Sequence, residues 1–280
     1  MMLISVYQAE ELIKAHNRKS TYTDISLDLG LTKSKVTIEN NFFIFPDQQK
    51  ITLEDIKKIV KKDTICFSIE NNSIMPTSIF SEETNNYYKL VPTGKDKWPT
   101  IEISGIRMHV TKTMSPKEDT EKKISFILPC IGNVLDTCTG LGYTAIMAAK
   151  IAELVFTIEK DANVIELEKI NPYSRELFDN SKIKRVHGDS FEEVKKFKAC
   201  YFDRIIHDPP RQALSTLLYS DEFYKELYRI LRSKGKIFHY TGDPGSKRGL
   251  DIRQGIAKKM AKAGFSNIKR VFNGLVAEKS

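Results

Sequence analysis

The sequence predicts an α/β protein, with a Rossmann-like, doubly wound and mostly parallel sheet of seven strands behind a small α+β domain. Three observations carry this prediction. From residue 116 onward, stretches of strand length alternate with helical stretches, and this alternation forces crossover connections between parallel strands. A turn with two glycines, Gly140 and Gly142, separates a predicted strand from a predicted helix. Before residue 115, the sequence has several short stretches of alternating polarity, typical of strands, and only two stretches with apolar residues at helical spacing.

The first predicted domain, residues 1–114, is a small α+β unit without a catalytic constellation of its own. Ser5 is placed to cap a helix over residues 6–14, where apolar residues recur at helical spacing. Residues 71–86 are polar and interrupted by a proline, which predicts a loop. The other predicted elements are a helix over residues 52–60 and strands over residues 23–29, 35–39, 65–69, 87–91 and 100–110.

The second predicted domain, residues 115–280, carries the alternating pattern. It begins with a helix start, because Ser115 can cap, Pro116 fits the first helical position and Glu118 follows the cap by three residues. Strands are predicted over residues 133–136, 154–159, 184–187, 203–207, 236–240, 268–272 and 274–277, and helices over residues 116–128, 143–151, 162–171, 191–196, 221–231 and 251–263. Ligands of such sheets bind at the carboxyl ends of the strands, so we searched those positions for chemistry.

Composition limits the function classes. The formal charge is +8, and the first 120 residues carry 16 basic and 16 acidic side chains, so the whole excess lies in residues 121–280. This basic excess favours a polyanionic partner, although a solvated basic surface explains it too. The four cysteines form no Cys-x-x-Cys pair, so we expect neither a metal site nor disulfides. Without a membrane-length apolar run or a signal-peptide pattern, we expect a cytoplasmic protein that does not bind membranes.

The first candidate site is the loop between the strand at 133–136 and the helix at 143–151. Asp136 ends the strand, while Gly140 and Gly142 let the backbone turn close to a ligand at the helix N-terminus. Taken alone, the glycine pattern also fits a dinucleotide-binding fingerprint. In a dehydrogenase, however, the first glycine follows the strand almost directly, whereas here three residues intervene, with Cys138 among them.

The arrangement Asp-x-Cys-x-Gly-x-Gly is similar to motif I of the class I S-adenosylmethionine-dependent methyltransferases, and the resemblance covers residues 116–280. It implies that Asp136 approaches the methionine end of S-adenosylmethionine. Glu159, which ends the next strand 17 residues past Gly142, is expected to bind the ribose hydroxyls. Asp189 matches the third motif and is implied to accept from the adenine amino group. The full predicted cofactor set is Asp136, Thr137, Cys138, Thr139, Gly140, Gly142, Tyr143, Thr144, Glu159, Lys160, Asp189, Ser190 and Asp208.

The second candidate site is Asp208-Pro209-Pro210-Arg211, directly after the strand at 203–207. These four residues are the predicted catalytic set. They resemble motif IV of enzymes that methylate exocyclic nitrogens, in which the Asp208 carboxylate and the Pro209 carbonyl would accept from the amine. Arg211 departs from the usual aromatic residue. With it, the motif looks like that of archaeal predicted RNA methyltransferases, and a base in RNA would be extruded into the site.

The sequence therefore favours an S-adenosylmethionine-dependent N-methyltransferase that acts on an exocyclic amine of a base in structured RNA, such as rRNA or tRNA. In this reading the partner is RNA, no metal is needed, and the first domain holds RNA, shapes the cleft or mediates dimerisation. Three alternatives stay open. They are a small-molecule methyl- or aminopropyltransferase of the same fold, a nicotinamide dehydrogenase, and a non-catalytic RNA-binding protein.

Overall fold

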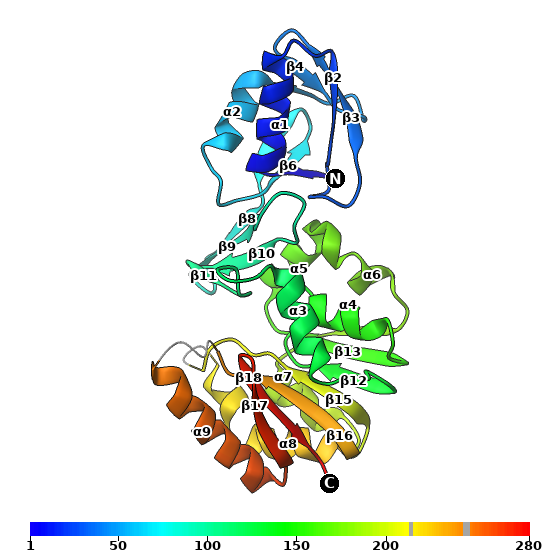
Figure 1. Cartoon of the computed structure of the whole chain (residues 1–280), viewed down its shortest axis with the longest axis vertical. Coiled ribbons are helices and arrows are strands. Elements are labelled where there is room, and N and C mark those ends of the chain that lie inside the picture. The colour runs from blue at the N-terminus through cyan, green and yellow to red at the C-terminus, as the bar shows by residue number, and fades with distance from the viewer. Residues whose placement is uncertain (213–214, 243–246) are drawn as a thin grey trace. The chain divides into compact units, whose positions relative to one another are not determined.

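A computed structural model describes residues 1–212, 215–242 and 247–280. The chain forms two compact units (Figure 1). The first comprises Met1–Lys117 and Glu166–Tyr173, and the second comprises Glu118–Ile165 and Ser174–Ser280. The short segment 166–173 thus groups with the N-terminal unit, although it follows a strand of the second unit in the sequence.

The N-terminal unit contains two complete helices and three small antiparallel sheets. Helix α1 (Val6–Asn17) starts at Ser5, which forms a capping box with Gln8, so the predicted cap is confirmed. Helix α2 (Leu53–Val60) is capped by Thr52. The sheets have the orders β1-β6-β7, β2-β3-β4-β5 and β11-β10-β9-β8. Their strands are β1 (Met2–Ile4), β2 (Tyr22–Ile25), β3 (Ser34–Glu39), β4 (Phe42–Ile44), β5 (Lys50–Thr52), β6 (Phe67–Glu70), β7 (Ser73–Pro76), β8 (Ser78–Ser81), β9 (Asn86–Val91), β10 (Thr100–Ile103) and β11 (Ile106–Arg107).

The loop prediction for residues 71–86 is wrong, because β7 and β8 lie within this stretch. Strand β7 pairs with β6 in register Ser68↔Met75, and β8 pairs with β9 in register Ile79↔Tyr88. The side chains of β7 are mostly exposed, so the sequence shows no alternation of buried and solvated residues there. Backbone pairing with a neighbouring strand decides these elements instead.

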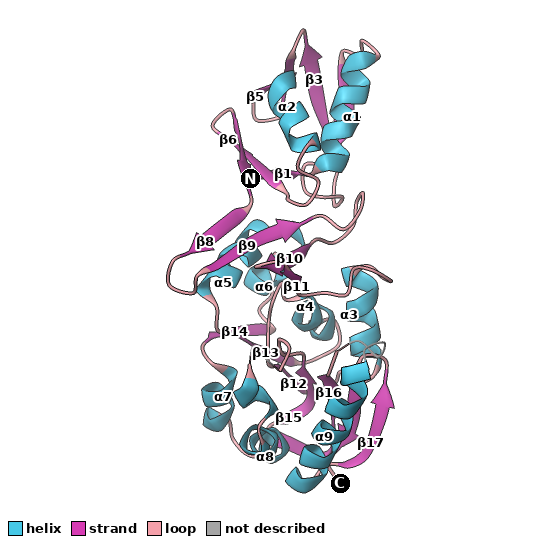
Figure 2. Cartoon of the chain, turned by 90° about the vertical axis from the view of Figure 1, so that its left-hand side faces the viewer, coloured by secondary structure: helices cyan, strands magenta, loops and turns pink. Residues whose placement is uncertain are grey.

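The second unit is built on one seven-stranded sheet with the order β14-β13-β12-β15-β16-β18-β17. Figure 2 shows β14, β13, β12 and β15 following one another in this sheet. The first five strands in this order are parallel, and β18 is antiparallel to both of its neighbours. The predicted fold class is therefore confirmed. The strands are β12 (Asn133–Asp136), β13 (Leu154–Glu159), β14 (Ile183–His187), β15 (Phe202–His207), β16 (Leu231–Tyr240), β17 (Ser266–Val271) and β18 (Gly274–Glu278).

Helices cover both faces of this sheet. Alternate strand residues point to opposite faces, so Val134 joins the core under α3, α4 and α6, whereas Leu135 joins the core under α8 and α9. The helical segments of this unit are α3 (Pro116–Ser125), α4 (Tyr143–Ala149), α5 (Ala162–Ile170), η1 (Pro172–Ser174), α6 (Glu176–Asp179), α7 (Ser190–Glu193), η2 (Val194–Lys196), η3 (Thr216–Tyr219), α8 (Asp221–Ile230) and α9 (Lys247–Ala263). The first two residues of α3 and residues 166–173 belong to the N-terminal unit. Among the described residues, no helix is both long and apolar enough to cross a membrane.

Candidate active site

Four acidic positions lie at the carboxyl edge of the parallel sheet. Asp136 ends β12 and Glu159 ends β13, while Asp189 and Asp208 follow the ends of β14 and β15. These strands are neighbours, because β13 lies between β14 and β12, and β12 pairs with β15. The register fixes their ends, since Glu159 pairs with His187 and Asp136 pairs with Ile206. The two predicted motifs therefore share one edge of the sheet.

Asp136 is fully buried beneath the glycine loop. Its Oδ2 atom accepts hydrogen bonds from the hydroxyls of Thr144, at 3.0 Å, and Thr157, at 3.1 Å. Its Oδ1 atom has no hydrogen-bond partner among the described residues. Burial raises the pKa of Asp136 to about 8, with the two threonine hydroxyls opposing this rise and the nearby Asp208 carboxylate adding to it. The carboxyl group is thus mostly neutral at physiological pH.

Gly140 and Gly142 have different tasks in the loop. Both have positive φ, +56° and +74°, which favours glycine. A Cβ atom on Gly142 would lie 2.3 Å from Leu177 Cδ1, so this glycine permits close packing of α4 against α6. A Cβ atom on Gly140 would meet no atom within 4 Å. Open space in front of Gly140, together with the unpartnered Oδ1 of Asp136, fits a ligand that lies against this loop.

Glu159 connects the end of β13 to the glycine loop. Its Oε2 atom accepts from the Gly140 amide at 3.0 Å, and its Oε1 atom accepts from the Asp161 amide at 2.9 Å. Burial raises the pKa of Glu159 even though these backbone amides act in the opposite direction. Each oxygen of Glu159 has a lone pair beyond the one that its amide partner uses. Glu159 therefore orders the loop and keeps acceptor capacity for a diol.

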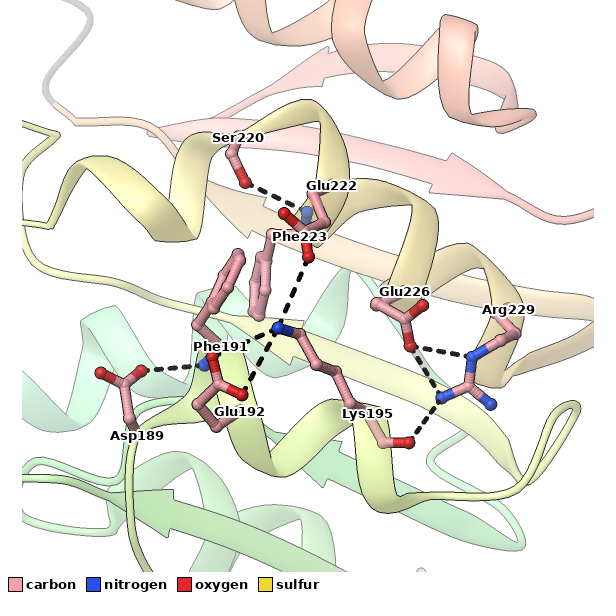
Figure 3. Close-up of polar contacts among 9 residues, drawn as sticks. All are labelled: Asp189, Phe191, Glu192, Lys195, Ser220, Glu222, Phe223, Glu226 and Arg229. Atoms are coloured by element: carbon pink, nitrogen blue, oxygen red, sulfur yellow. Dashed lines mark hydrogen bonds and ion pairs between the residues drawn. The ribbon is translucent and has the colours of Figure 1, made fainter.

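Asp189 caps helix α7, as Figure 3 shows, with Oδ1 accepting from the Phe191 amide at 2.9 Å. Its Oδ2 atom pairs with Lys160 at 2.8 Å. Burial raises the pKa of Asp189, but hydrogen bonds from Lys160 and Phe191 outweigh it and hold the pKa below its usual value. Ser190 donates to the carbonyl of Thr137, which ties α7 to the motif I loop.

Asp208 belongs to a buried ion cluster that the sequence analysis missed. Lys123 of α3 binds Asp208 Oδ2 at 2.7 Å and Asp119 Oδ2 at 2.7 Å. The side chains of Asp119 and Lys123 are 1% and 5% exposed, whereas that of Asp208 is 21% exposed. Burial alone would lower the pKa of Lys123, but the two carboxylates together raise it, so the ammonium stays charged. The i,i+4 spacing of Asp119 and Lys123 was a signal, but it looks the same in an exposed surface pair.

His207, the last residue of β15, connects this strand end to the motif I loop and to η3 by hydrogen bonds. Its Nε2 atom lies 3.0 Å from the Leu218 carbonyl and must donate to it, so Nδ1 accepts from the Thr137 hydroxyl at 2.7 Å. Burial lowers the pKa of His207 to about 3, which keeps the ring neutral. Tyr219 donates to the Pro210 carbonyl at 2.9 Å and holds the second proline of the motif. These contacts fix the backbone that carries Asp208.

The remaining predicted site residues lie in two kinds of surroundings. Cys138 is half-buried and Tyr143 is buried; burial raises the pKa of the Cys138 thiol well above its usual value, so it is no nucleophile at neutral pH. Thr139 shares a hydrogen bond of 2.7 Å with Thr157 below the loop. Arg211 is exposed beyond the prolines. Among the described residues, no group of three or more histidine, cysteine or acidic side chains is arranged to hold a metal ion.

The comparisons with known proteins place this edge in a family context. Residues 136–272 match the model of the spermine/spermidine synthase domain. The chain is 34% identical to polyamine aminopropyltransferase 2 of Aquifex aeolicus and 31% identical to the polyamine aminopropyltransferase of Prochlorococcus marinus strain MIT 9301. These alignments cover 40% and 43% of this chain, but only 23% and 44% of the two relatives. The chain thus spans less than half the length of the aminopropyltransferases that it matches.

Solved structures agree on the fold. A spermidine synthase in complex with the transition-state analogue AdoDATO has a TM-score of 0.60 and 20% identity, over 76% of this chain and 80% of that one. Spermidine synthase from Thermotoga maritima has a TM-score of 0.57, also at 20% identity, over 76% and 78% of the two chains. At this identity the likeness shows the methyltransferase-like fold that S-adenosylmethionine-dependent enzymes use.

These matches overturn the predicted function. The prediction of an RNA N-methyltransferase with an RNA-binding motif IV is wrong, because the matching family model and named relatives are those of aminopropyl-transferring enzymes. The Asp208-Pro209-Pro210 motif does not by itself identify an RNA base as the substrate. Two hydrogen-bond acceptors at a strand end suit an amine of any kind. Over 265 residues the chain is 46% identical to the uncharacterized protein MJ1233 of Methanocaldococcus jannaschii, which covers 92% of this chain and 89% of that protein. The chain therefore belongs to the same family as MJ1233, with a spermine/spermidine synthase-like domain over residues 136–272.

Proposed function

We propose that this protein is an aminopropyltransferase, which transfers an aminopropyl group from decarboxylated S-adenosylmethionine to the amine of a small molecule. The family match over residues 136–272 supports this proposal, as do the names of the aminopropyltransferase relatives. The observation that carries it is a single sheet edge with two different halves. One half is the glycine loop with open space at Gly140, and the other is the partly exposed carboxylate of Asp208.

The reaction itself is a displacement at carbon. The lone pair of the acceptor nitrogen attacks the propyl carbon next to the sulfonium, and the carbon–sulfur bond breaks toward sulfur. Sulfur leaves as the neutral thioether of 5′-methylthioadenosine, and the new nitrogen–carbon bond leaves an extra proton on nitrogen. The sulfonium is already an activated donor. The protein therefore has to position the two substrates, exclude water from them and accept one proton from the amine.

On the donor side, the proposed roles follow from the contacts of the loop. Glu159 has acceptor capacity for the two ribose hydroxyls, while Asp189 lies one strand further out for the adenine end. Asp136 is mostly neutral at physiological pH, and its Oδ2 accepts from both threonine hydroxyls, so the proton belongs on the unpartnered Oδ1, which can donate a hydrogen bond to a bound nucleoside. A donor molecule with a cationic sulfonium would lie between this loop and Asp208.

On the acceptor side, Asp208 would receive the attacking amine. An ionised carboxylate binds an ammonium through charge-assisted hydrogen bonds and can take one of its protons before the attack, which frees the nitrogen lone pair; the alkylated nitrogen then carries the positive charge. The Pro209 carbonyl, next in the chain, offers a second acceptor on a backbone that Tyr219 holds at Pro210. Both acceptors belong to one short segment, which orients the nitrogen toward the sulfonium carbon.

The product identifies the reaction. The purified full chain is incubated with 1,4-diaminobutane or spermidine and with either decarboxylated or intact S-adenosylmethionine, and the nucleoside product is measured by mass spectrometry. We expect 5′-methylthioadenosine from the decarboxylated donor, only when an amine is present. Formation of S-adenosylhomocysteine from the intact donor would instead identify a small-molecule methyltransferase, and the aminopropyl proposal would be lost.

A further inference from the structure

The buried ions Asp119, Lys123 and Asp208, called the α3 cluster below, differ in their access to solvent. Asp119 and Lys123 are almost completely buried on α3, and Asp208 alone is partly exposed. Lys123 bridges the two carboxylates with nitrogen–oxygen distances of 2.7 Å on both sides. A cation that already occupies one oxygen of Asp208 would repel a cationic amine, unless its charge were cancelled.

Asp119 supplies that cancellation. Its Oδ2 atom pairs with Lys123, and neither of its carboxylate oxygens has any other hydrogen-bond partner among the described residues. A buried carboxylate with so few partners is costly, which argues against a purely stabilising role. Burial raises the pKa of Asp119, while the charge of Lys123 opposes this rise. With all three groups ionised, the α3 cluster has a net charge of −1, and its exposed member is Asp208.

Among the residues whose side chains the structure describes, three further groups near the α3 cluster leave this count unchanged. Asp136 is mostly neutral, and the Tyr240 ring lies 4.9 Å from Lys123 Nζ as a neutral phenol whose pKa burial raises to about 12. Arg211 is exposed to solvent, which screens its charge. The net charge at Asp208 therefore depends on the balance within α3.

We propose that Asp119 and Lys123 are positioning residues that set the charge presented by Asp208 to −1, so that Lys123 fixes the carboxylate without preventing it from binding a cationic amine. The inference rests on the proposed function, since it names how that site recognises its acceptor. It makes the acceptor class an aliphatic ammonium. A neutral aromatic amine would gain nothing from this charge balance.

The test is a rescue by a second substitution. Asp119→Asn makes the α3 cluster neutral, and we expect the Kd and KM for 1,4-diaminobutane to rise on the order of tenfold, with kcat changed by less than about threefold. Adding Lys123→Met returns the net charge to −1, so Asp119→Asn/Lys123→Met should regain most of the lost affinity. Calorimetric titration and steady-state kinetics of the full chain measure these values.

A matched control uses the neighbouring lysine. Lys122 is exposed on the same helix, over the Phe272 ring at 4.0 Å. Asp119→Asn/Lys122→Met removes the same number of charges from α3 and should not regain amine affinity. A purely structural role of the α3 cluster predicts that both double variants bind the amine no better than Asp119→Asn, and that result overturns the proposal.

Other outcomes are equally decisive. If Asp119→Asn does not fold, as judged by circular dichroism, the Asp119→Asn/Lys123→Met variant carries the test against the unchanged protein, and a tenfold loss of affinity overturns the inference. If the variants rank in amine affinity as expected but no protein forms methylthioadenosine, the proposed function is refuted and the charge inference remains intact. If methylthioadenosine forms but the variants do not rank in amine affinity as expected, the inference is refuted. It is also refuted if the unchanged protein does not bind the diamine.

Discussion

In the proposed site, Asp136 and Glu159 of the donor half and Asp208 of the acceptor half have different kinds of hydrogen-bond partners. In the donor half, Asp136 and Glu159 are held by threonine hydroxyls and backbone amides, which are neutral donors. In the acceptor half, Asp208 is held by the ammonium of Lys123. Neutral donors do not offset burial, so the pKa values of Asp136 and Glu159 are raised.

This difference suits the charges of the two ligands. In the proposed donor half, neutral hydroxyls and backbone amides order Asp136 and Glu159, the two acids next to the glycine loop. Under the proposed function, the acceptor amine arrives as a cation and must lose a proton before it attacks, so its site needs an ionised carboxylate. The comparison teaches that the number of acidic residues does not predict the charge of a site, because the partners of each acid decide it.

The sharpest test of this contrast removes the charge of Asp208. Asp208→Asn should lower kcat/KM for aminopropyl transfer by about 100-fold or more, about 3 kcal/mol, because the amide binds an ammonium poorly and takes no proton. The affinity for the nucleoside should change by less than about threefold, since the donor half is intact. Methylthioadenosine formation and calorimetry measure the two quantities. If nucleoside affinity fell as much as turnover, the two halves would not be separate.

The second test concerns the neutral state of Asp136. The usual pKa of this group is 3.8, and in the folded protein it is about 8. Between these values the folded state keeps a proton that the unfolded state has lost, so the free energy of unfolding falls as pH rises, by at most about 1.4 kcal/mol per pH unit. Asp136→Asn keeps an acceptor for Thr144 and Thr157 but cannot titrate, so this contribution should disappear.

Urea denaturation at about pH 5.5, 6.5 and 7.5 compares the slopes of stability against pH. The unchanged protein should lose stability over this range relative to Asp136→Asn. Asp179→Asn, at an exposed carboxylate paired with Arg175, serves as the control and should keep the original slope. Parallel curves for all three proteins would show that Asp136 is ionised in the fold.

The smallest expected effect comes from the ion network around Lys195 (Figure 3). Lys195 lies 3.2 Å from Glu192 and 3.4 Å from Glu222, and its Nζ lies 4.1 Å from the centre of the Phe191 ring. The glutamates are mostly exposed, so water screens the pairs. Lys195→Ala should lower the free energy of unfolding by about 0.5 kcal/mol or less in urea denaturation, and Lys225→Ala on α8 is the exposed control. A loss above about 2 kcal/mol would show that this exposed network contributes as much to the free energy of unfolding as a buried ion pair does.

The sequence by itself determined the alternating framework and the positions of most chemical groups along it. The strand ends at Asp136 and Glu159 and the capped start of α1 follow from local signals, which are periodicity, glycine turns and capping residues. The strands β7 and β8 did not follow, since their exposed residues depend on pairing with neighbouring strands.

Only the tertiary structure decided what surrounds Asp208. Lys123 is 85 residues away in the sequence, and nothing in α3 distinguishes it from the exposed Lys122 until the helix packs on the sheet. The same limit explains the wrong choice of acceptor from Asp208-Pro209-Pro210. A short motif fixes which groups can accept a hydrogen bond, but the net charge of a site is a sum over residues that folding brings together from distant parts of the chain.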